Sequence, residues 1–161
     1  MDSTKEMYQF GLYIWDKRKI ARFSSFGSYP YPPNLFSTYP YEWITVFSKQ
    51  GKRPKVAKEI KEKSKLTTKE WQDWAINSIW EMQPASAKRE KHPAPFPDEM
   101  PKRLIKLHSF YGDTVLDPFL GTGTTAKVAL ELGRKAIGYE LNKEYEPLIA
   151  KKLTAVEECV L

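Results

Sequence analysis

The chain has 161 residues, of which 41% are hydrophobic, enough to bury the core of one ordinary domain. Its net charge of +6 favours a polyanionic partner, with a solvated basic surface as the alternative. The single cysteine, Cys159, excludes an internal disulfide and a cysteine-based zinc site. No run approaches the roughly 20 apolar residues of a membrane span, and the first residues lack a signal peptide's apolar core. We therefore expect a cytoplasmic protein without a membrane partner.

The first third of the chain carries two strand patterns separated by an aromatic loop. Residues 10–15 are apolar and aromatic and predict a strand that ends in a charged turn. Residues 22–34 are dense in Ser, Gly, Pro and aromatic side chains, which is typical of a partly extended loop. Residues 41–47 are β-branched and aromatic and predict a second strand. These two strands can form one antiparallel pair.

The middle of the chain is rich in lysine. Residues 48–65 form either a solvated face or a set of phosphate contacts. Thr67 and Glu70 have the spacing of a capping box, which predicts a short helix through Trp74. Residues 78–82 are a brief apolar stretch, and residues 83–90 indicate a linker.

Three prolines hold residues 92–97 extended before a predicted helix. Asp98 and Glu99 suit the first turn of that helix, and Pro101 suits an early position, so we expect it to run to His108. Taken alone, His92 is best interpreted as a capping or packing histidine.

The chain is organised around a glycine-rich turn. Residues 115–117 predict a strand, residues 121–123 form the turn, and a helix pattern follows to a stop at Gly133. A second strand pattern, residues 136–141, carries Glu140 near its end. Glycines let the backbone pass close to a ligand, the helix start offers free N–H groups, and the acid can accept ribose hydroxyls. A cofactor site is therefore favoured over a turn without a ligand.

Residues 117–125 read Asp-Pro-Phe-Leu-Gly-Thr-Gly-Thr-Thr. This run resembles the cofactor motif of the DNA amino-methyltransferases, which use S-adenosylmethionine. The resemblance implies an α/β fold, a partial Rossmann-like S-adenosylmethionine-dependent methyltransferase fold with an antiparallel strand pair. It also implies a role in DNA methylation and restriction-modification, with double-stranded DNA as partner. Together with the upstream proline segment and the second strand, it assigns cofactor contacts, and no metal site, to His92, Pro93, Ala94, Pro95, Phe96, Asp117, Pro118, Phe119, Gly121, Gly123, Thr124, Thr125, Glu140 and Asn142.

Other segments resemble the same family. His-Pro-Ala-Pro-Phe-Pro at 92–97 is similar to the segment that lines the methionine side of the cofactor. Three segments in the first half, at 14–17, 26–29 and 41–47, are similar to the late motifs of the catalytic domain. The resemblance therefore implies catalytic-domain elements at 1–48, a basic target-recognition segment at 49–90 and an S-adenosylmethionine-binding unit at 91–161.

The family's chemistry depends on a further motif, Asp/Asn/Ser-Pro-Pro-aromatic, which holds the flipped base. The only Pro-Pro of these residues lies in Tyr31-Pro32-Pro33-Asn34, where the polar and aromatic ends are exchanged. We therefore assign no catalytic residue. The chain resembles the last portion of a permuted enzyme in which the cofactor half comes last. Such a portion leaves strand edges that a partner chain with the motif, or self-association, would cover.

We expect a DNA methyltransferase, adenine-N6 or cytosine-N4 specific, or its cofactor-binding and DNA-contacting part, inactive as the lone chain. The alternative is a basic DNA-binding remnant of such an enzyme that no longer catalyses transfer. A nicotinamide-dependent oxidoreductase is disfavoured, because only one strand–helix–strand unit follows the glycines, whereas a dinucleotide site needs two halves.

Overall fold

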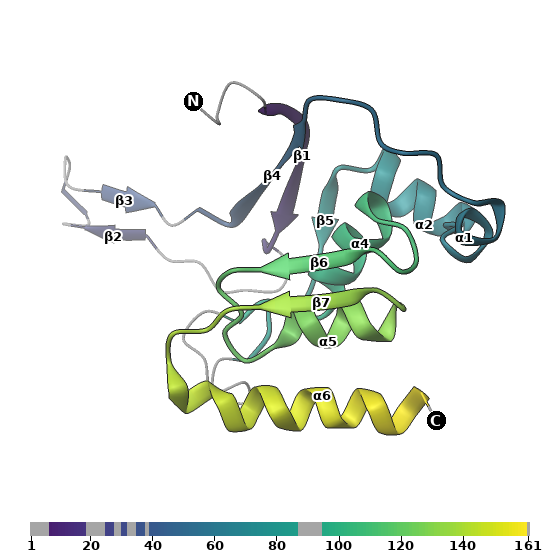
Figure 1. Cartoon of the computed structure of the whole chain (residues 1–161). Helices are drawn as coiled ribbons and strands as arrows, with labels where there is room; N and C mark the ends of the chain where they lie inside the picture. Colours follow the sequence, from purple (N-terminus) through teal and green to yellow (C-terminus); the bar gives the residue numbers. More distant parts are fainter. Residues whose placement is uncertain are drawn as a thin grey trace. The chain divides into compact units, whose positions relative to one another are not determined.

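The computed structural model describes residues 7–18, 25–27, 30–31, 35–37, 39–86 and 95–160. The chain divides into two compact units, which Figure 1 draws together. The first unit joins Met1–Arg53 to Ile76–Pro84, and the second joins Pro54–Ala75 to Ala85–Leu161. Most of the basic segment therefore belongs to the same unit as the glycine turn.

A three-stranded sheet forms the centre of the first unit. β1 (Met7–Asp16) pairs antiparallel with β4 (Tyr41–Lys49), as the sequence predicts. β5 (Ile79–Glu81) lies parallel to β1 on its other side, which gives the order β4-β1-β5 (Figure 1). Two further short strands, β2 (Ser25–Gly27) and β3 (Leu35–Ser37), pair with each other.

One face of the β4-β1-β5 sheet carries buried indoles. Trp15 and Trp80 lie opposite each other on β1 and β5, and both are buried. The Tyr13 ring stacks on Trp80 with 4.3 Å between the ring centroids. The Trp15 indole N–H donates to the carbonyl of Met82 at 2.8 Å, so the buried ring keeps a hydrogen-bond partner. β5 is thus fixed to β1 by aromatic packing as well as by backbone pairing.

The second unit contains the predicted strand–turn–helix–strand module. β6 (Thr114–Asp117) and β7 (Lys135–Gly138) are parallel, and α5 (Thr124–Glu131) connects them (Figure 1). Side chains alternate along the strands, so Val115 and Ala136 face the same core. The core that they contact consists of Ile105, Val128 and Ala129.

Two longer helices complete this unit. α4 (Glu99–His108) precedes β6 and supplies Ile105 to the core. The 3₁₀ turn η3 (Lys143–Tyr145) leads into α6 (Glu146–Val160), which packs along α5 (Figure 1). Among the described helices, none combines the length and apolarity that a membrane crossing requires.

Most of the basic segment is attached to α4 through charged and aromatic contacts. It folds as α1 (Lys58–Lys63), α2 (Thr68–Glu70) and the π-helical turn η2 (Trp71–Ile76). The capping box predicted at Thr67 and Glu70 forms, with both reciprocal hydrogen bonds present. Burial raises the pKa of Glu70, but hydrogen bonds from Lys106 and from the Thr67 backbone outweigh it and hold that pKa below its ordinary value.

Arg134 ties the ends of two helices together. Its side chain is buried and donates to the carbonyls of Leu132 at 2.6 Å and Ser109 at 2.9 Å. These carbonyls lie at the C-terminal ends of α5 and α4, where free acceptors and the helix dipole both favour a cation. Burial lowers the pKa of Arg134 from its ordinary value.

Several local expectations differ from the structure. β2 lies in the stretch expected to be loop and β3 directly follows it, β5 lies in the apolar stretch, and α1 lies in the lysine-rich run. β7 ends at Gly138, so Glu140 follows the strand instead of lying within it. The β2, β3 and β5 segments have three residues each, and α1 has no buried residue, so local periodicity is too weak to identify them.

We predict that Gly133→Ala destabilises the fold more than Gly112→Ala. Both glycines have positive φ, +70° and +81°, so either substitution should cost about 1–2 kcal/mol of backbone strain. A Cβ at Gly133 would also stand 2.1 Å from the Tyr111 ring, whereas one at Gly112 meets nothing within 4 Å. Urea unfolding of both variants measures the difference, and equal losses would show that the Tyr111 ring moves aside at no cost.

Candidate functional site

The glycine turn lies between β6 and α5. Gly121 and Gly123 have φ of +56° and +86°, a conformation that side-chain-bearing residues rarely adopt. The Asp117 carboxylate accepts a hydrogen bond from the Phe119 N–H at 2.9 Å, which closes the first part of the turn. The Leu120 N–H donates to the Tyr139 carbonyl at 2.9 Å and links the turn to the residue after β7. Asp117 therefore shapes the turn directly.

Glu140 connects the second strand to this turn. One carboxylate oxygen accepts from the Gly121 N–H at 2.7 Å, and the other accepts from the Asn142 N–H at 2.8 Å. A carboxylate offers about four lone-pair sites, more than these two N–H groups use. Asn142 in turn caps η3, because its side-chain oxygen accepts from the Glu144 N–H at 3.0 Å. Three of the predicted site residues, Gly121, Glu140 and Asn142, are thus joined by two hydrogen bonds.

Helix α6 supports the turn from the other side. A Cβ on Gly123 would lie 3.4 Å from the Ile149 backbone, an ordinary contact distance, so α6 packs directly against the turn. The Lys152 ammonium donates to the hydroxyls of Thr122 at 2.9 Å and Thr124 at 3.0 Å. Both threonines are buried. Sequence reasoning missed Ile149 and Lys152, which lie three residues apart on one face of α6.

A pocket of about 360 Å³ adjoins Glu140. It lies within the size range of small-molecule sites. Of the predicted site residues, Glu140 and Asn142 line it, whereas Asp117, Gly121 and Gly123 do not. The lining consists of Leu120, Gly138, Glu140, Asn142, Lys143, Glu146, Ile149 and Ala150. Two carboxylates against one ammonium favour hydroxyl donors or a cationic ligand and disfavour phosphates.

The end of the proline segment lies beside the start of α5. Asp98 forms an ion pair with Lys127 on α5, with 2.6 Å between Oδ2 and Nζ. This hydrogen bond to Asp98 holds the pKa of Lys127 above its ordinary value. Pro95 and Phe96 directly precede this contact and are half-buried. His92, Pro93 and Ala94 lie outside the described residues, as do Pro32, Pro33 and Asn34 of the Tyr-Pro-Pro-Asn loop.

The remaining predicted residues fall into an exposed and a buried group. Pro118 is exposed and the Phe119 side chain is 88% exposed, whereas Thr124 is buried and Thr125 half-buried. Leu141, which follows Glu140, is 97% exposed. The structure therefore places apolar side chains in solvent next to both predicted acidic residues.

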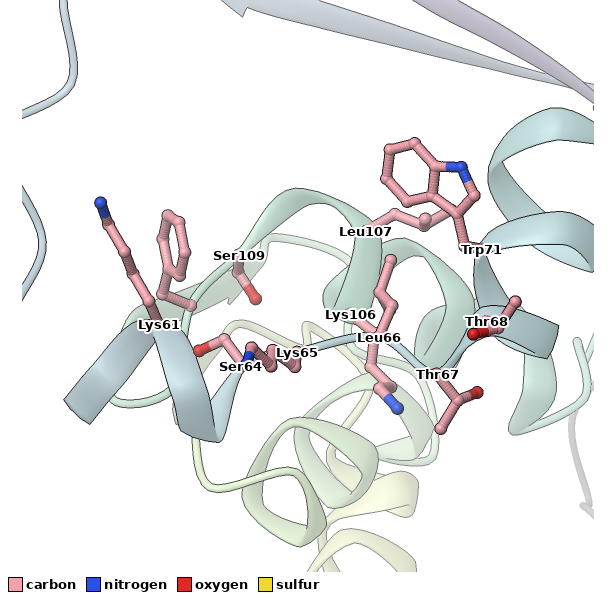
Figure 2. Close-up of a pocket in the computed structure, with 11 residues that line it drawn as sticks. Lys61, Ser64, Lys65, Leu66, Thr67, Thr68, Trp71, Lys106, Leu107 and Ser109 are labelled. Carbon is pink, nitrogen blue, oxygen red and sulfur yellow. The ribbon is translucent and has the colours of Figure 1, made fainter. Parts of the chain in front are cut away.

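A second concave region, about 580 Å³ in volume, lies between the basic segment and α4 (Figure 2). It combines the exposed Trp71 with apolar and lysine side chains, including Leu66, Lys61 and Lys106. Phe110 and Ser109 at the end of α4 line it, whereas Asp98 at the start of α4 contacts the helix that follows the glycine turn. The ten-residue length of α4 therefore separates this groove from the cofactor turn.

The family comparison agrees with the module seen in the second unit. The model of the DNA methylase family, N6 and N4 methyltransferases, matches residues 2–152. The chain belongs to the DNA methylase family. The matched residues include parts of both units and all three of the sheets in the described part of the chain.

Individual relatives match over nearly the whole chain. The Type II methyltransferase M.MjaI of Methanocaldococcus jannaschii is 41% identical over 143 residues, which are 87% of this chain and 47% of the relative. The Type II methyltransferase M.BglI of Bacillus subtilis is 35% identical, over 92% of this chain and 41% of the relative.

A solved structure agrees with the fold. The DNA modification methylase of Thermus thermophilus, complexed with S-adenosyl-L-methionine, is 32% identical with a TM-score of 0.74. The match covers 94% of this chain and 55% of that one. The fold is therefore the α/β, partial Rossmann-like methyltransferase fold that the sequence predicts. The chain spans about half the length of the relatives it matches.

We predict that Lys152→Met destabilises the second unit by about 1 kcal/mol. The variant loses two hydrogen bonds, each worth about 1 kcal/mol of folding stability. It also removes the Lys152 cation that lies beside the first turn of α5, and this removal stabilises the fold by about 0.3–1 kcal/mol. The hydrogen bonds therefore outweigh the helix dipole. Lys151→Met, at the exposed neighbouring position, is the matched control and should leave the unfolding midpoint unchanged. Equal midpoints for both variants would contradict the role given to Lys152.

Proposed function

We propose that these 161 residues are the cofactor-binding and DNA-contacting portion of a DNA methyltransferase that modifies a base amino group, adenine N6 or cytosine N4. The bond from the Gly121 N–H to Glu140 carries the proposal, because it joins the two features that a nucleoside-type cofactor needs. The family match and relatives described as Type II methyltransferases support the reaction class.

The residues fit S-adenosylmethionine. The Glu140 carboxylate is fixed in place by two backbone N–H groups, and a carboxylate beside the turn is the type of acceptor that ribose hydroxyls need. The pocket beside it has two carboxylates and one ammonium, which suits a ligand without phosphates. When bound, the cofactor would supply an electrophilic methyl group on a sulfonium. This chain's part is to bind and orient: Glu140 takes the ribose, and the turn shaped by Asp117 takes the methionyl portion.

The same pocket disfavours a nicotinamide dinucleotide. A pyrophosphate needs positive charge and free N–H groups close to the turn. Glu140 occupies the Gly121 N–H, and Glu146 adds a second negative charge. A phosphate would be repelled by both.

DNA contact is proposed for the basic segment. Residues 52–65 contain seven basic and two acidic side chains, so they hold five of the six net positive charges of the chain. Within the second unit Lys65 pairs with Glu62 at 2.5 Å, and Lys63 stands 4.8 Å from the Tyr111 ring centroid. Basic side chains of this run are proposed to contact phosphates, which supply most of the sequence-independent affinity for DNA.

Transfer itself is proposed to need a further polypeptide segment. Direct transfer requires an acceptor that aligns the base amine with the sulfonium, and such positioning is worth about 7–11 kcal/mol. These residues contain no Asp/Asn/Ser-Pro-Pro-aromatic sequence. A separate chain or joined segment that carries it would supply the acceptor and the stacking ring.

A second candidate is a DNA-binding remnant that no longer takes part in transfer. The positive charge on residues 52–65 favours a DNA-binding remnant as much as it favours a working part of a methyltransferase. The cofactor site separates the two, because a remnant has no need for a preserved turn and acid.

We predict that Glu140→Ala weakens S-adenosylmethionine binding by about 1–3 kcal/mol, the cost of losing hydrogen bonds to a charged group. Isothermal titration calorimetry measures the affinity. Glu144→Ala is the matched control, because Glu144 is exposed and lies outside the pocket lining. Urea unfolding of both variants separates lost binding from lost folding. An unchanged affinity for a folded Glu140→Ala variant would remove Glu140 from the site.

We also predict that the lone chain binds S-adenosylmethionine and transfers no methyl group to DNA. Co-expression with a segment that carries the Pro-Pro motif should restore transfer, because it supplies the missing acceptor. The assay is tritiated methyl incorporation into mixed-sequence DNA. Incorporation by the pure lone chain that is lost on Asn34→Ala would contradict the need for a second segment. Absence of cofactor binding would favour the remnant.

A further inference from the structure

One face of the β4-β1-β5 sheet is apolar and exposed. Ile14 lies opposite Trp43 on β4 and opposite Ile79 on β5, so the three side chains form one row across the sheet. Trp43 is 65% exposed and Ile79 is 47% exposed. Leu12 and Phe47, further along the same strands and on the same side, are 41% and 55% exposed. We call these five side chains the Trp43 face.

The described part of the first unit contains nothing that covers this face. Its described elements are strands and their connections, apart from Ile76 at the end of η2, and the buried indoles Trp15 and Trp80 lie on the opposite side. Strand residues that face solvent in an antiparallel pair are ordinarily polar. A group of large apolar side chains in solvent marks an interaction surface.

A polar border closes one end of the Trp43 face. The Asp16 carboxylate is buried and receives the Arg18 side chain in a two-point contact, from Nε at 3.0 Å and from Nη2 at 2.7 Å. The Arg18 guanidinium also stands 5.3 Å from the centroid of Tyr41, which lies opposite Asp16. An apolar centre with a charged, hydrogen-bonded rim is the usual anatomy of a protein interface.

The second unit repeats the pattern. Leu116 and Ile137 lie opposite each other on the side of the β6–β7 sheet away from its core, and they are 58% and 50% exposed. In α/β folds both faces of such sheets are covered, ordinarily by helices. The relatives have about twice the length of chain that is available here, 47% and 55% of their lengths being matched.

We infer that the Trp43 face is a docking surface, and that an amphipathic helix of the polypeptide segment proposed to carry the acceptor-Pro-Pro-aromatic motif covers it. This inference rests on the proposed function, because that segment is its occupant. Trp43 is the central anchor: it has the largest side chain of the row, and tryptophan is enriched among residues that dominate binding energy. A second copy of this chain is the competing occupant.

The test uses the full chain co-expressed with the part of the M. jannaschii relative that lies outside the 143 matched residues. That part carries an affinity tag, and the amount of untagged chain recovered with it is measured. Trp43→Lys places a charge in the centre of the face, and because Trp43 is 65% exposed the variant should stay folded. Trp71→Lys, an exposed tryptophan of the other unit, is the matched control.

Wild type and Trp71→Lys should be recovered equally, and Trp43→Lys at least tenfold less, with unchanged unfolding midpoints for all three. Equal recovery of Trp43→Lys would overturn the docking surface, as would no recovery of the wild type. Sedimentation of the lone chain tests the competing occupant. A dimer would assign the face to a second copy if Trp43→Lys abolishes it and the added segment does not displace it, and this result would contradict the inference. Cofactor affinity and methyl incorporation are measured on the same samples. If Trp43→Lys is still recovered with the segment and the pair transfers methyl groups, the proposed function is supported and the docking surface is refuted.

Discussion

The hydrogen bond between the Gly121 N–H and the Glu140 carboxylate is the interaction on which the candidate site depends. At 2.7 Å it connects the turn after β6 to the residue that follows β7, across 19 positions of sequence. The two strands run parallel, so both segments emerge at the same edge of the sheet. A carboxylate held by two backbone N–H groups is fixed before any ligand arrives. Pre-organisation of this kind reduces the entropy that binding must overcome.

Helix α6 packs against the glycine turn and supplies partners to its buried hydroxyls. Ile149 approaches Gly123 to contact distance, and Lys152 reaches under the turn to the hydroxyls of Thr122 and Thr124. Buried hydroxyls without partners would be costly, so the lysine satisfies a requirement that the turn itself creates. The positive φ of Gly123 accounts for the glycine, because a Cβ there would meet Ile149 only at an ordinary contact distance.

The module around the glycine turn could be predicted because its signals are local. Residues 115–133 contain a short apolar run, a motif of fixed spacing and a helix with a glycine stop, and each appears in the structure as β6, the turn and α5. β5 could not be predicted, because three residues become a strand only through pairing with β1. Lys152 was missed for a similar reason: its partners lie 28 and 30 residues away, and only tertiary packing brings them together. α1 has no buried residue and so leaves no apolar period to detect.

Charge is divided between two parts of the second unit. The pocket beside Glu140 has two carboxylates and one lysine, whereas residues 54–65, the part of the basic run in this unit, hold three net positive charges. The proposed cofactor carries a positive sulfonium, and the proposed substrate is a polyanion, so opposite ligands meet opposite fields. The ten-residue helix α4 stands between the groove of the basic segment and the cofactor turn, and it reduces mutual cancellation of these fields, which fall off over about 8 Å at physiological salt. A single basic surface would attract DNA but would also repel the cofactor, and this arrangement avoids that conflict within one small unit.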